Sequence, residues 1–220
     1  MITIALAKGR LAHESIKIFK NIEIGDYICI DSRKLIFEDK KNGIRFLYVK
    51  PSDVVIYVQK GVADLGIVGK DVILESDSDV YEVCDLGFGK CKFSVAGKSD
   101  QVINKKDKVL KVATKYPKVA TKYFEEKNQP IEIIKLNGSV ELAPLVGLSD
   151  VIVDIVETGN TLKVNGLAVL EDISAISARL IANRVSYRFK LEEISYIVKS
   201  LENCLDQLVI VNSFFKKIYF

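Results

Sequence analysis

Short apolar segments alternate with amphipathic segments along this chain, and this alternation constrains the fold more than any other feature of the sequence. The apolar segments have the length of β-strands, and the amphipathic ones carry apolar residues at helical spacing. Ile2 to Ala7 is followed by a segment with Leu11, Ile16 and Phe19 on one face, and residues 108–127 repeat this layout. Such alternation predicts an α/β fold, in which helices are layered on sheets.

The same patterns predict the remaining elements. Asn42-Gly43 is a strong turn signal inside a hairpin-like stretch at 27–49, whose apolar runs lie at 29–30, 35–37 and 44–49. Pro51 and Gly61 have the positions expected for the first residue of a helix and for its stop. Further strands are expected at 64–69, 91–96, 131–136, 150–156 and 167–170, and further helices at 140–146, 172–183 and 191–208. The run 104–108 is expected to be a solvated loop.

Composition argues against several classes of function. No run of about 18 apolar residues exists and the start lacks the features of a signal peptide, so we expect a cytoplasmic protein that does not bind membranes. The net charge is +3 and the 32 basic residues are spread out, which argues against nucleic-acid binding. The four cysteines are widely scattered and His13 is the only histidine, so neither a zinc site nor a Ser-His-Asp triad is expected. His13 fits better as a solvated helix residue.

The segment from Asp150 to Leu162 is the strongest candidate for a binding site. A buried strand ends there in Glu157-Thr158-Gly159-Asn160-Thr161. Gly159 permits close backbone approach, and hydroxyls and successive amides can surround an anion at the start of a helix. Asp154 interrupts an apolar strand, where sugar hydroxyls or a metal would satisfy its carboxylate. The residues alone leave a second interpretation open, in which this is an ordinary turn and Asp154 caps nearby amides.

Three other segments could contribute to a site at the carboxyl ends of strands, where ligands bind in open α/β sheets. Lys8-Gly9-Arg10 places glycine between two cations, and could equally be a solvated turn. In the segment 61–71, Gly66 and Gly69 precede Lys70 and Asp71, although such glycines can simply allow tight packing. In Asn137-Gly138-Ser139-Val140-Glu141, Ser139 could cap a helix while Glu141 binds hydroxyls or Mg²⁺.

Together these segments resemble the ATP phosphoribosyltransferase family, which carries out the first step of histidine biosynthesis. The resemblance runs from Ile2 to about Arg188. Its strongest stretches are ALAKGRL (5–11), YVQKGVADLGIVGKDVILE (57–75), CDLGFGKCKFSVAGK (84–98), KVATKYPKVATKYF (111–124) and LNGSVELAPLVGLSDVIVDIVETGNTLKVNGL (136–167). The last stretch resembles the family's signature region. The chain departs from many members at Ala7, where they have proline, and at Val55-Ile56, where they have Pro-Thr.

The resemblance implies an α/β, two-lobed periplasmic-binding-protein-like (type II) fold with the active site in the interlobe cleft. Lobe I would comprise residues 1–88 and 184–220, and lobe II residues 89–183 with the phosphoribosyl pyrophosphate signature. The chain would cross between lobes near 86–90 and near 183–187. The length is similar to that of the family's short form, which works with a histidyl-tRNA synthetase-like regulatory subunit, so a homodimer alone or a hetero-octamer with that partner is implied.

The resemblance also implies an activity and its residues. The enzyme would condense ATP, through N1 of adenine, with 5-phosphoribosyl 1-pyrophosphate, using Mg²⁺ held mainly by substrate phosphates. Asp154 and Glu141 would be catalytic and bind the ribose hydroxyls. The 5-phosphate would be bound by Thr158, Gly159, Asn160, Thr161 and Leu162. ATP would be bound by Lys8, Gly9, Arg10, Asp71 and Tyr116. Of the residues proposed at the rim of the cleft, Lys50, Asp71 and Tyr116 are the weaker candidates. The alternatives are a non-catalytic two-lobed binder of a small anion and an interaction protein that uses its C-terminal helix.

Overall fold

The computed structural model describes residues 1–25, 28, 33–101, 103 and 108–218, with side chains as far as Gln207. The chain forms two compact units. Unit 1 is Met1–Gly89 together with Ser177–Phe220, and unit 2 is Lys90–Ile176. Unit 2 is therefore an insertion into unit 1, which contains both chain ends. Within the described ranges, no helix combines the length and the apolar character needed to cross a membrane.

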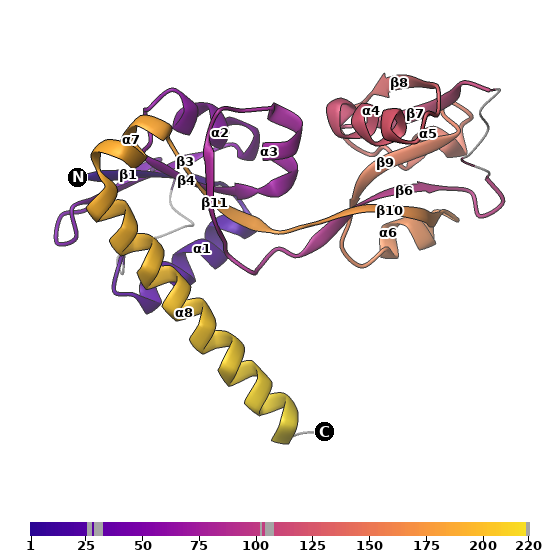
Figure 1. Cartoon of the computed structure of the whole chain (residues 1–220). Helices are drawn as coiled ribbons and strands as arrows, with labels where there is room; N and C mark the ends of the chain where they lie inside the picture. The colour runs from indigo at the N-terminus through magenta and orange to yellow at the C-terminus, as the bar shows by residue number, and fades with distance from the viewer. Residues whose placement is uncertain (26–27, 29–32, 102, 104–107, 219–220) are drawn as a thin grey trace. The chain divides into compact units, whose positions relative to one another are not determined.

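Unit 1 is built on a six-stranded sheet covered by helices (Figure 1). Its elements are β1 (Ile2–Ala7), α1 (Arg10–Asn21), β2 (Ile36–Asp39), β3 (Ile44–Val49), α2 (Pro51–Gln59), β4 (Leu65–Gly69), α3 (Lys70–Ser76), β5 (Tyr81–Asp85), β11 (Ala178–Ala182), α7 (Arg184–Phe189) and α8 (Leu191–Ile218). The strand order is β2-β3-β1-β4-β11-β5. Because β1 is parallel to β3 and to β4, these three strands end at the same edge of the sheet.

The sheet of unit 1 is buried on both faces. Phe19 and Phe46 meet edge to face, with ring centroids 5.3 Å apart, in the apolar cluster on one side. On the other side α2 lies close against β4, where a Cβ on Gly66 would come within 2.8 Å of Cγ1 of Val54 and 2.7 Å of Cγ2 of Val58. Glycine at this position therefore serves tight helix-to-sheet packing, the simpler of the two roles considered for it.

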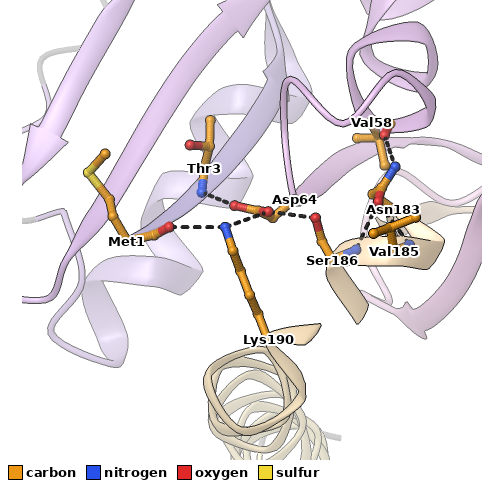
Figure 2. Close-up of polar contacts among 8 residues, drawn as sticks. All are labelled: Met1, Thr3, Val58, Asp64, Asn183, Val185, Ser186 and Lys190. Atoms are coloured by element: carbon orange, nitrogen blue, oxygen red, sulfur yellow. Dashed lines mark hydrogen bonds and ion pairs between the residues drawn. The ribbon is translucent and has the colours of Figure 1, made fainter. Parts of the chain in front are cut away.

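A polar clamp joins the C-terminal segment of unit 1 to its first strand (Figure 2). Asp64, which is 6% exposed, precedes β4 and accepts hydrogen bonds from the Thr3 amide at 2.8 Å, the Ser186 hydroxyl at 2.6 Å and the Lys190 ammonium at 2.8 Å. Asn183 caps α7 by accepting from the amides of Val185 and Ser186. The clamp lies at the amino ends of β1 and β4, opposite the edge where these strands end.

Unit 2 contains a five-stranded sheet in the order β10-β6-β9-β7-β8. Its elements are β6 (Cys91–Gly97), β7 (Leu110–Thr114), α4 (Pro117–Glu126), β8 (Ile131–Lys135), α5 (Leu142–Leu145), β9 (Val151–Val156), α6 (Asn160–Val164) and β10 (Ala168–Ile176). β7 is parallel to β8 and β9, while β6 runs antiparallel to β9. The carboxyl ends of β7, β8 and β9 therefore share one edge, as the three parallel strands of unit 1 do.

Most predicted elements are confirmed, but the helix predicted at 172–183 is wrong. That stretch forms the end of β10 and the whole of β11, and β11 pairs with β4 and β5. The chain therefore returns to unit 1 at Ser177 and not near 183–187, and residues 177–183 belong with the first unit instead of the second. The short elements α3 and β5 were not predicted. The expected runs at 29–30 and 104–107 lie outside the described residues.

Candidate active site

The predicted phosphate-binding segment lines a cavity at the carboxyl edge of the unit 2 sheet. The cavity has a volume of about 210 Å³. Its lining comes from the end of β9, the turn into α6 and the segment that follows β8, and consists of Glu141, Asp154, Ile155, Val156, Glu157, Thr158, Gly159, Thr161 and Leu162. Parallel pairing of β7 with both β8 and β9 explains why residues from two separate loops meet at this edge.

The turn after β9 has the backbone that the sequence predicts. Gly159 adopts a left-handed conformation with φ 75° and caps α6, which begins at Asn160. The Thr158 hydroxyl accepts a long hydrogen bond of 3.4 Å from the Asn160 amide, while buried Leu162 anchors the helix to the sheet. Of the predicted 5-phosphate ligands, Thr158, Gly159, Thr161 and Leu162 line the cavity, and Asn160 lies on the same turn. Their binding role stays a prediction.

A row of polar side chains that was not predicted from the sequence crosses the sheet beside Asp154. Asp154 is half-buried and pairs directly with Ser94 of β6, which pairs in turn with Asp172 of β10. The buried Ser94 hydroxyl donates to Asp172 Oδ1 at 3.0 Å, and Lys92 Nζ lies 2.6 Å from Asp172 Oδ2. The Lys92 hydrogen bond lowers the pKa of Asp172 below its ordinary value. Alternation in Cys91–Gly97 puts Lys92 and Ser94 on one face, and that was the available signal.

The edge of unit 2 is also fixed at β7. Thr114 is buried, and its hydroxyl donates to the Val153 carbonyl at 2.7 Å while accepting from the Tyr116 amide at 2.8 Å. Tyr116, a predicted ATP-binding residue, is 7% exposed and its ring meets Phe93 edge to face at 4.9 Å. Tyr116 thus lies on the edge that carries the cavity, but most of its ring belongs to the core of unit 2.

The predicted residues of unit 1 also gather at one sheet edge. Lys8 and Arg10 follow β1, Lys50 follows β3, and Asp71 comes just after β4, so parallel pairing brings all three loops to the same edge. Lys8 and Arg10 are exposed on either side of Gly9, which has φ 101° and caps α1. His13, on the exposed side of α1, is a solvated helix residue as expected.

Asp71 is folded back over the end of β4. Its Oδ1 atom lies 2.1 Å from the place that a Cβ on Gly69 would occupy, so a larger residue at position 69 would displace this carboxylate. This half-buried carboxylate is thus held close to the backbone at the start of α3. The assignment of Lys8, Gly9, Arg10 and Asp71 to ATP stays a prediction.

Comparison with known proteins identifies the family of this chain. A sequence model of the HisG family, described as ATP phosphoribosyltransferase, matches residues 50–203. An ATP phosphoribosyltransferase from Clostridioides difficile (strain 630) is 68% identical over 201 residues, which cover 91% of this chain and 97% of the relative. One from Brachyspira hyodysenteriae (strain ATCC 49526 / WA1) is 53% identical over 210 residues, covering 93% and 100%, respectively.

Solved structures agree with this assignment. A chain of the ATP phosphoribosyl transferase (HisG:HisZ) complex from Thermotoga maritima aligns with a TM-score of 0.82 and 36% identity, covering 94% of this chain and 100% of its own length. Two transport proteins share the fold at a TM-score of 0.60: a substrate-binding protein of an amino acid ABC transporter, 13% identical, and the Escherichia coli aliphatic sulphonate binding protein SsuA, 14% identical. They cover 98% of this chain, which confirms the periplasmic-binding-protein-like fold. The family match and the high-identity relatives together show that this chain belongs to the ATP phosphoribosyltransferase family.

Proposed function

We propose that this chain transfers the phosphoribosyl group of 5-phosphoribosyl 1-pyrophosphate to N1 of the adenine of ATP, releasing pyrophosphate. The observation that supports this most strongly is the cavity at the end of β9, where the half-buried carboxylate of Asp154 lies beside the glycine turn of residues 157–162. Family membership supports the same activity. A non-catalytic anion binder is disfavoured because relatives of 53–68% identity are named as the transferase.

The turn at 158–162 would hold the 5-phosphate of the donor. Exposed hydroxyls of Thr158 and Thr161 and the first amides of α6 can donate hydrogen bonds to its oxygens. Asp154 and Glu141 would accept hydrogen bonds from the ribose hydroxyls. In the transfer the bond from ribose C1 to the pyrophosphate oxygen breaks, the electron pair leaves with pyrophosphate, and adenine N1 forms the new bond to C1. Carboxylates near the sugar would stabilise the positive charge that develops on the ring.

The edge of unit 1 would bind ATP. The ammonium of Lys8 and the guanidinium of Arg10 are exposed beside the N-terminus of α1, a position that favours phosphate groups. Asp71 and Tyr116 are further candidates at the two edges. Because adenine N1 is itself the nucleophile, the protein's task is to orient and to stabilise charge, and orientation alone can contribute about 7–11 kcal/mol in favourable cases.

The residues of the cavity fit Mg²⁺ that is bound chiefly by substrate phosphates. Asp154, Glu141 and Glu157 supply carboxylate oxygens, which Mg²⁺ prefers, and it usually takes one or two of these besides phosphates and water. Among the described residues no group of three or more His, Cys, Asp or Glu side chains is arranged as a metal site. Asp154 and Glu141 would hold the ion, which would neutralise charge on the pyrophosphate.

The chain is further proposed to work as the short-form catalytic subunit. The chain matches 97% and 100% of the length of two relatives, and the similar Thermotoga maritima chain comes from a HisG:HisZ complex. A HisZ-like subunit related to histidyl-tRNA synthetase would then be its partner and would convey inhibition by histidine, in a hetero-octamer. We place this activity in the cytoplasm, where ATP and phosphoribosyl pyrophosphate are both available.

The direct test is to incubate the chain with ATP, phosphoribosyl pyrophosphate and Mg²⁺, with and without a HisZ-like subunit. The adduct phosphoribosyl-ATP, detected by mass spectrometry together with released pyrophosphate, is the expected product. Histidine should inhibit only when the subunit is present. Absence of adduct under both conditions would refute the proposed activity, and full histidine sensitivity without the subunit would refute the short-form assignment.

A matched pair of variants tests the role of Asp154. Asp154→Asn should reduce turnover by about 100-fold or more, since charge stabilisation at the sugar is lost. Asp150→Asn is the control, because Asp150 precedes the same strand at its opposite end and accepts a hydrogen bond from the Lys111 amide at 2.9 Å. Equal activities of the two variants would remove Asp154 from the mechanism.

A further inference from the structure

A charged network occupies the place where the chain leaves unit 1 and returns to it. Arg179 of β11 is its centre: one guanidinium nitrogen lies 3.1 Å from Glu82 Oε1 and the other lies 2.8 Å from Asp85 Oδ2. Its side chain is 18% exposed. The Arg179 Nε atom is buried with no partner among the described residues. A buried donor without a partner costs free energy. The guanidinium is therefore held in place by its ion pairs with Glu82 and Asp85, while its Nε–H has no hydrogen-bond partner among the described residues.

Each carboxylate partner of Arg179 also binds a second segment. Glu82 Oε1 is 3.2 Å from the ammonium of Lys70, the first residue of α3. Asp85 Oδ1 accepts from the Ser177 hydroxyl at 2.8 Å and from the Gly87 amide at 2.9 Å. The guanidinium therefore connects the start of α3 with both segments through which the chain passes between the units.

Backbone hydrogen bonds follow the same route. The Lys70 amide donates to the Ser177 carbonyl at 2.9 Å, which joins the start of α3 to the return segment. The outgoing and return segments are joined to each other by two backbone hydrogen bonds. The Leu86 amide donates to the Ala178 carbonyl at 3.0 Å, and the Ala178 amide donates to the Phe88 carbonyl at 2.9 Å. The start of α3, which carries Asp71 as its second residue, is thus tied to the chain crossing through both the side chain and the backbone of Lys70.

We propose that Arg179 is a positioning residue that, through Glu82 and Lys70, holds the start of α3 and its Asp71 in the geometry that binds ATP. The inference rests on the proposed function for the assignment of Asp71 to ATP. The same contacts fix the exit of both crossing segments from unit 1, so the start of α3 and the exit are held as one body. The cavity at β9 belongs to unit 2 and has none of its lining residues in this network.

The test compares Arg179→Met and Arg179→Lys with a matched control, Arg184→Met. Arg184 also pairs with a carboxylate, Asp79 at 2.9 Å, and its guanidinium lies over the Tyr81 ring, but it is 53% exposed and lies outside the network. Two readouts are taken on each full-length variant. One is amide hydrogen exchange in peptides that cover 66–76, and the other is KM for each substrate at saturating concentrations of the other.

Arg179→Met should accelerate exchange at 66–76 and raise KM for ATP about tenfold, because a misplaced Asp71 at the start of α3 loses binding geometry. KM for phosphoribosyl pyrophosphate should stay within about twofold of the wild type, since its ligands lie in unit 2. Arg179→Lys can reach one carboxylate, so its exchange rate at 66–76 and its KM for ATP should lie between those of the wild type and Arg179→Met. Arg184→Met should match the wild type in both measurements. If Arg179→Met does not fold, the two single variants Arg179→Lys and Ser177→Ala are compared with the wild type in the same measurements.

The proposal is overturned if exchange at 66–76 is unchanged, or if the two KM values rise together. Hydrogen exchange separates this outcome from a failure of the proposed function. If the wild type forms no phosphoribosyl-ATP but the Arg179 variants still loosen residues 66–76, the transferase assignment fails while the positioning role stands. If the wild type is active and exchange does not respond, the positioning role alone is refuted.

Discussion

Replacing Asp64 by asparagine should destabilise unit 1 without altering the transfer reaction. The Asp64 carboxylate joins the first strand to α7 and to the residue before α8, through Thr3, Ser186 and Lys190 (Figure 2). It lies at the amino ends of β1 and β4, away from the edge that carries Lys8 and Arg10. We therefore expect a loss of folding free energy with kcat and both KM values unchanged.

The size of the loss follows from burial and from the contacts. Removing one partner of a buried ion pair typically costs about 3–5 kcal/mol. The Lys190 side chain is 37% exposed and can be rehydrated, and the asparagine oxygen can still accept from Thr3, so we expect about 2–3 kcal/mol. For a chain of this size, that corresponds to a fall in Tm of about 5–10 °C.

The effect should depend on pH in a defined direction. Burial by itself raises the pKa of Asp64, but the hydrogen bonds from Lys190, Ser186 and the Thr3 amide outweigh it and hold the pKa below its ordinary value. A carboxylate with a lowered folded pKa stabilises the fold above its unfolded pKa of about 3.9 and loses this contribution as pH falls through the folded value. The difference between wild type and Asp64→Asn should therefore be constant near neutral pH and shrink below about pH 4.

Urea unfolding of both proteins across this pH range is the assay, with Asp79→Asn as the control. Asp79 also pairs with an arginine, but its side chain is 63% exposed, and such surface pairs contribute about 0–1 kcal/mol. A loss for Asp64→Asn no greater than that of the control would refute the argument. So would a difference that increases as the solution is acidified.

Three further changes have expected outcomes. Gly66→Ala should cost about 1–3 kcal/mol by overpacking against α2, and Val58→Ala in the same chain should restore part of it, as urea unfolding can show. Gly159→Ala should strain a residue with φ 75° by about 1–2 kcal/mol and raise KM for phosphoribosyl pyrophosphate, whereas an unchanged KM would count against phosphate binding by the turn at 158–162. Glu171→Gln should lower Tm because Glu171 accepts hydrogen bonds from the Tyr123 hydroxyl of α4 and from the ammonium of Lys127, which follows α4. Equal Tm values for the variant and the wild type would contradict this.

The predicted phosphate-binding segment, from Asp154 to Leu162, could be recognised because its signals are local. β9 is an apolar run of strand length, and Gly159 stands where the backbone needs a positive φ before α6. Asp154 was noticeable as a carboxylate in an otherwise apolar strand. Each signal needs only neighbouring residues, so one sequence contains enough information to place the cavity-lining segment.

The helix predicted at 172–183 shows where periodicity misleads. Leu180 and Ile181 are both fully buried, because Leu180 packs into the cluster on one face of the unit 1 sheet and Ile181 into the cluster on the other. A strand buried on both faces has no alternation, and its apolar residues can match helical spacing by chance. Placing β11 wrongly also moved the expected return to unit 1 from Ser177 to residue 184.

Contacts set by strand order could not be predicted from the sequence. Arg179 meets Glu82 because β11 lies between β4 and β5, and Ser94 neighbours Asp154 because β6 pairs with β9. Neither pairing follows from local spacing. The buried ring of Tyr116 has the same origin, since it packs against Phe93 of β6, so the order of strands decides which polar residues surround the site.

The insertion of unit 2 into unit 1 has a consequence for synthesis on the ribosome. Of the described strands, β5 is hydrogen-bonded to β11 alone, and β11 is translated about ninety residues later. Strands β1 to β4 can pair as they emerge, but β5 must wait as an unpaired edge while the whole of unit 2 is made. At about 5–20 residues per second, that interval lasts about 5–18 seconds. Unit 2, whose strands are contiguous in sequence, is complete at Ile176, before β11 and the core residues of α8 have been made, so the nascent chain completes its inserted domain before its first one.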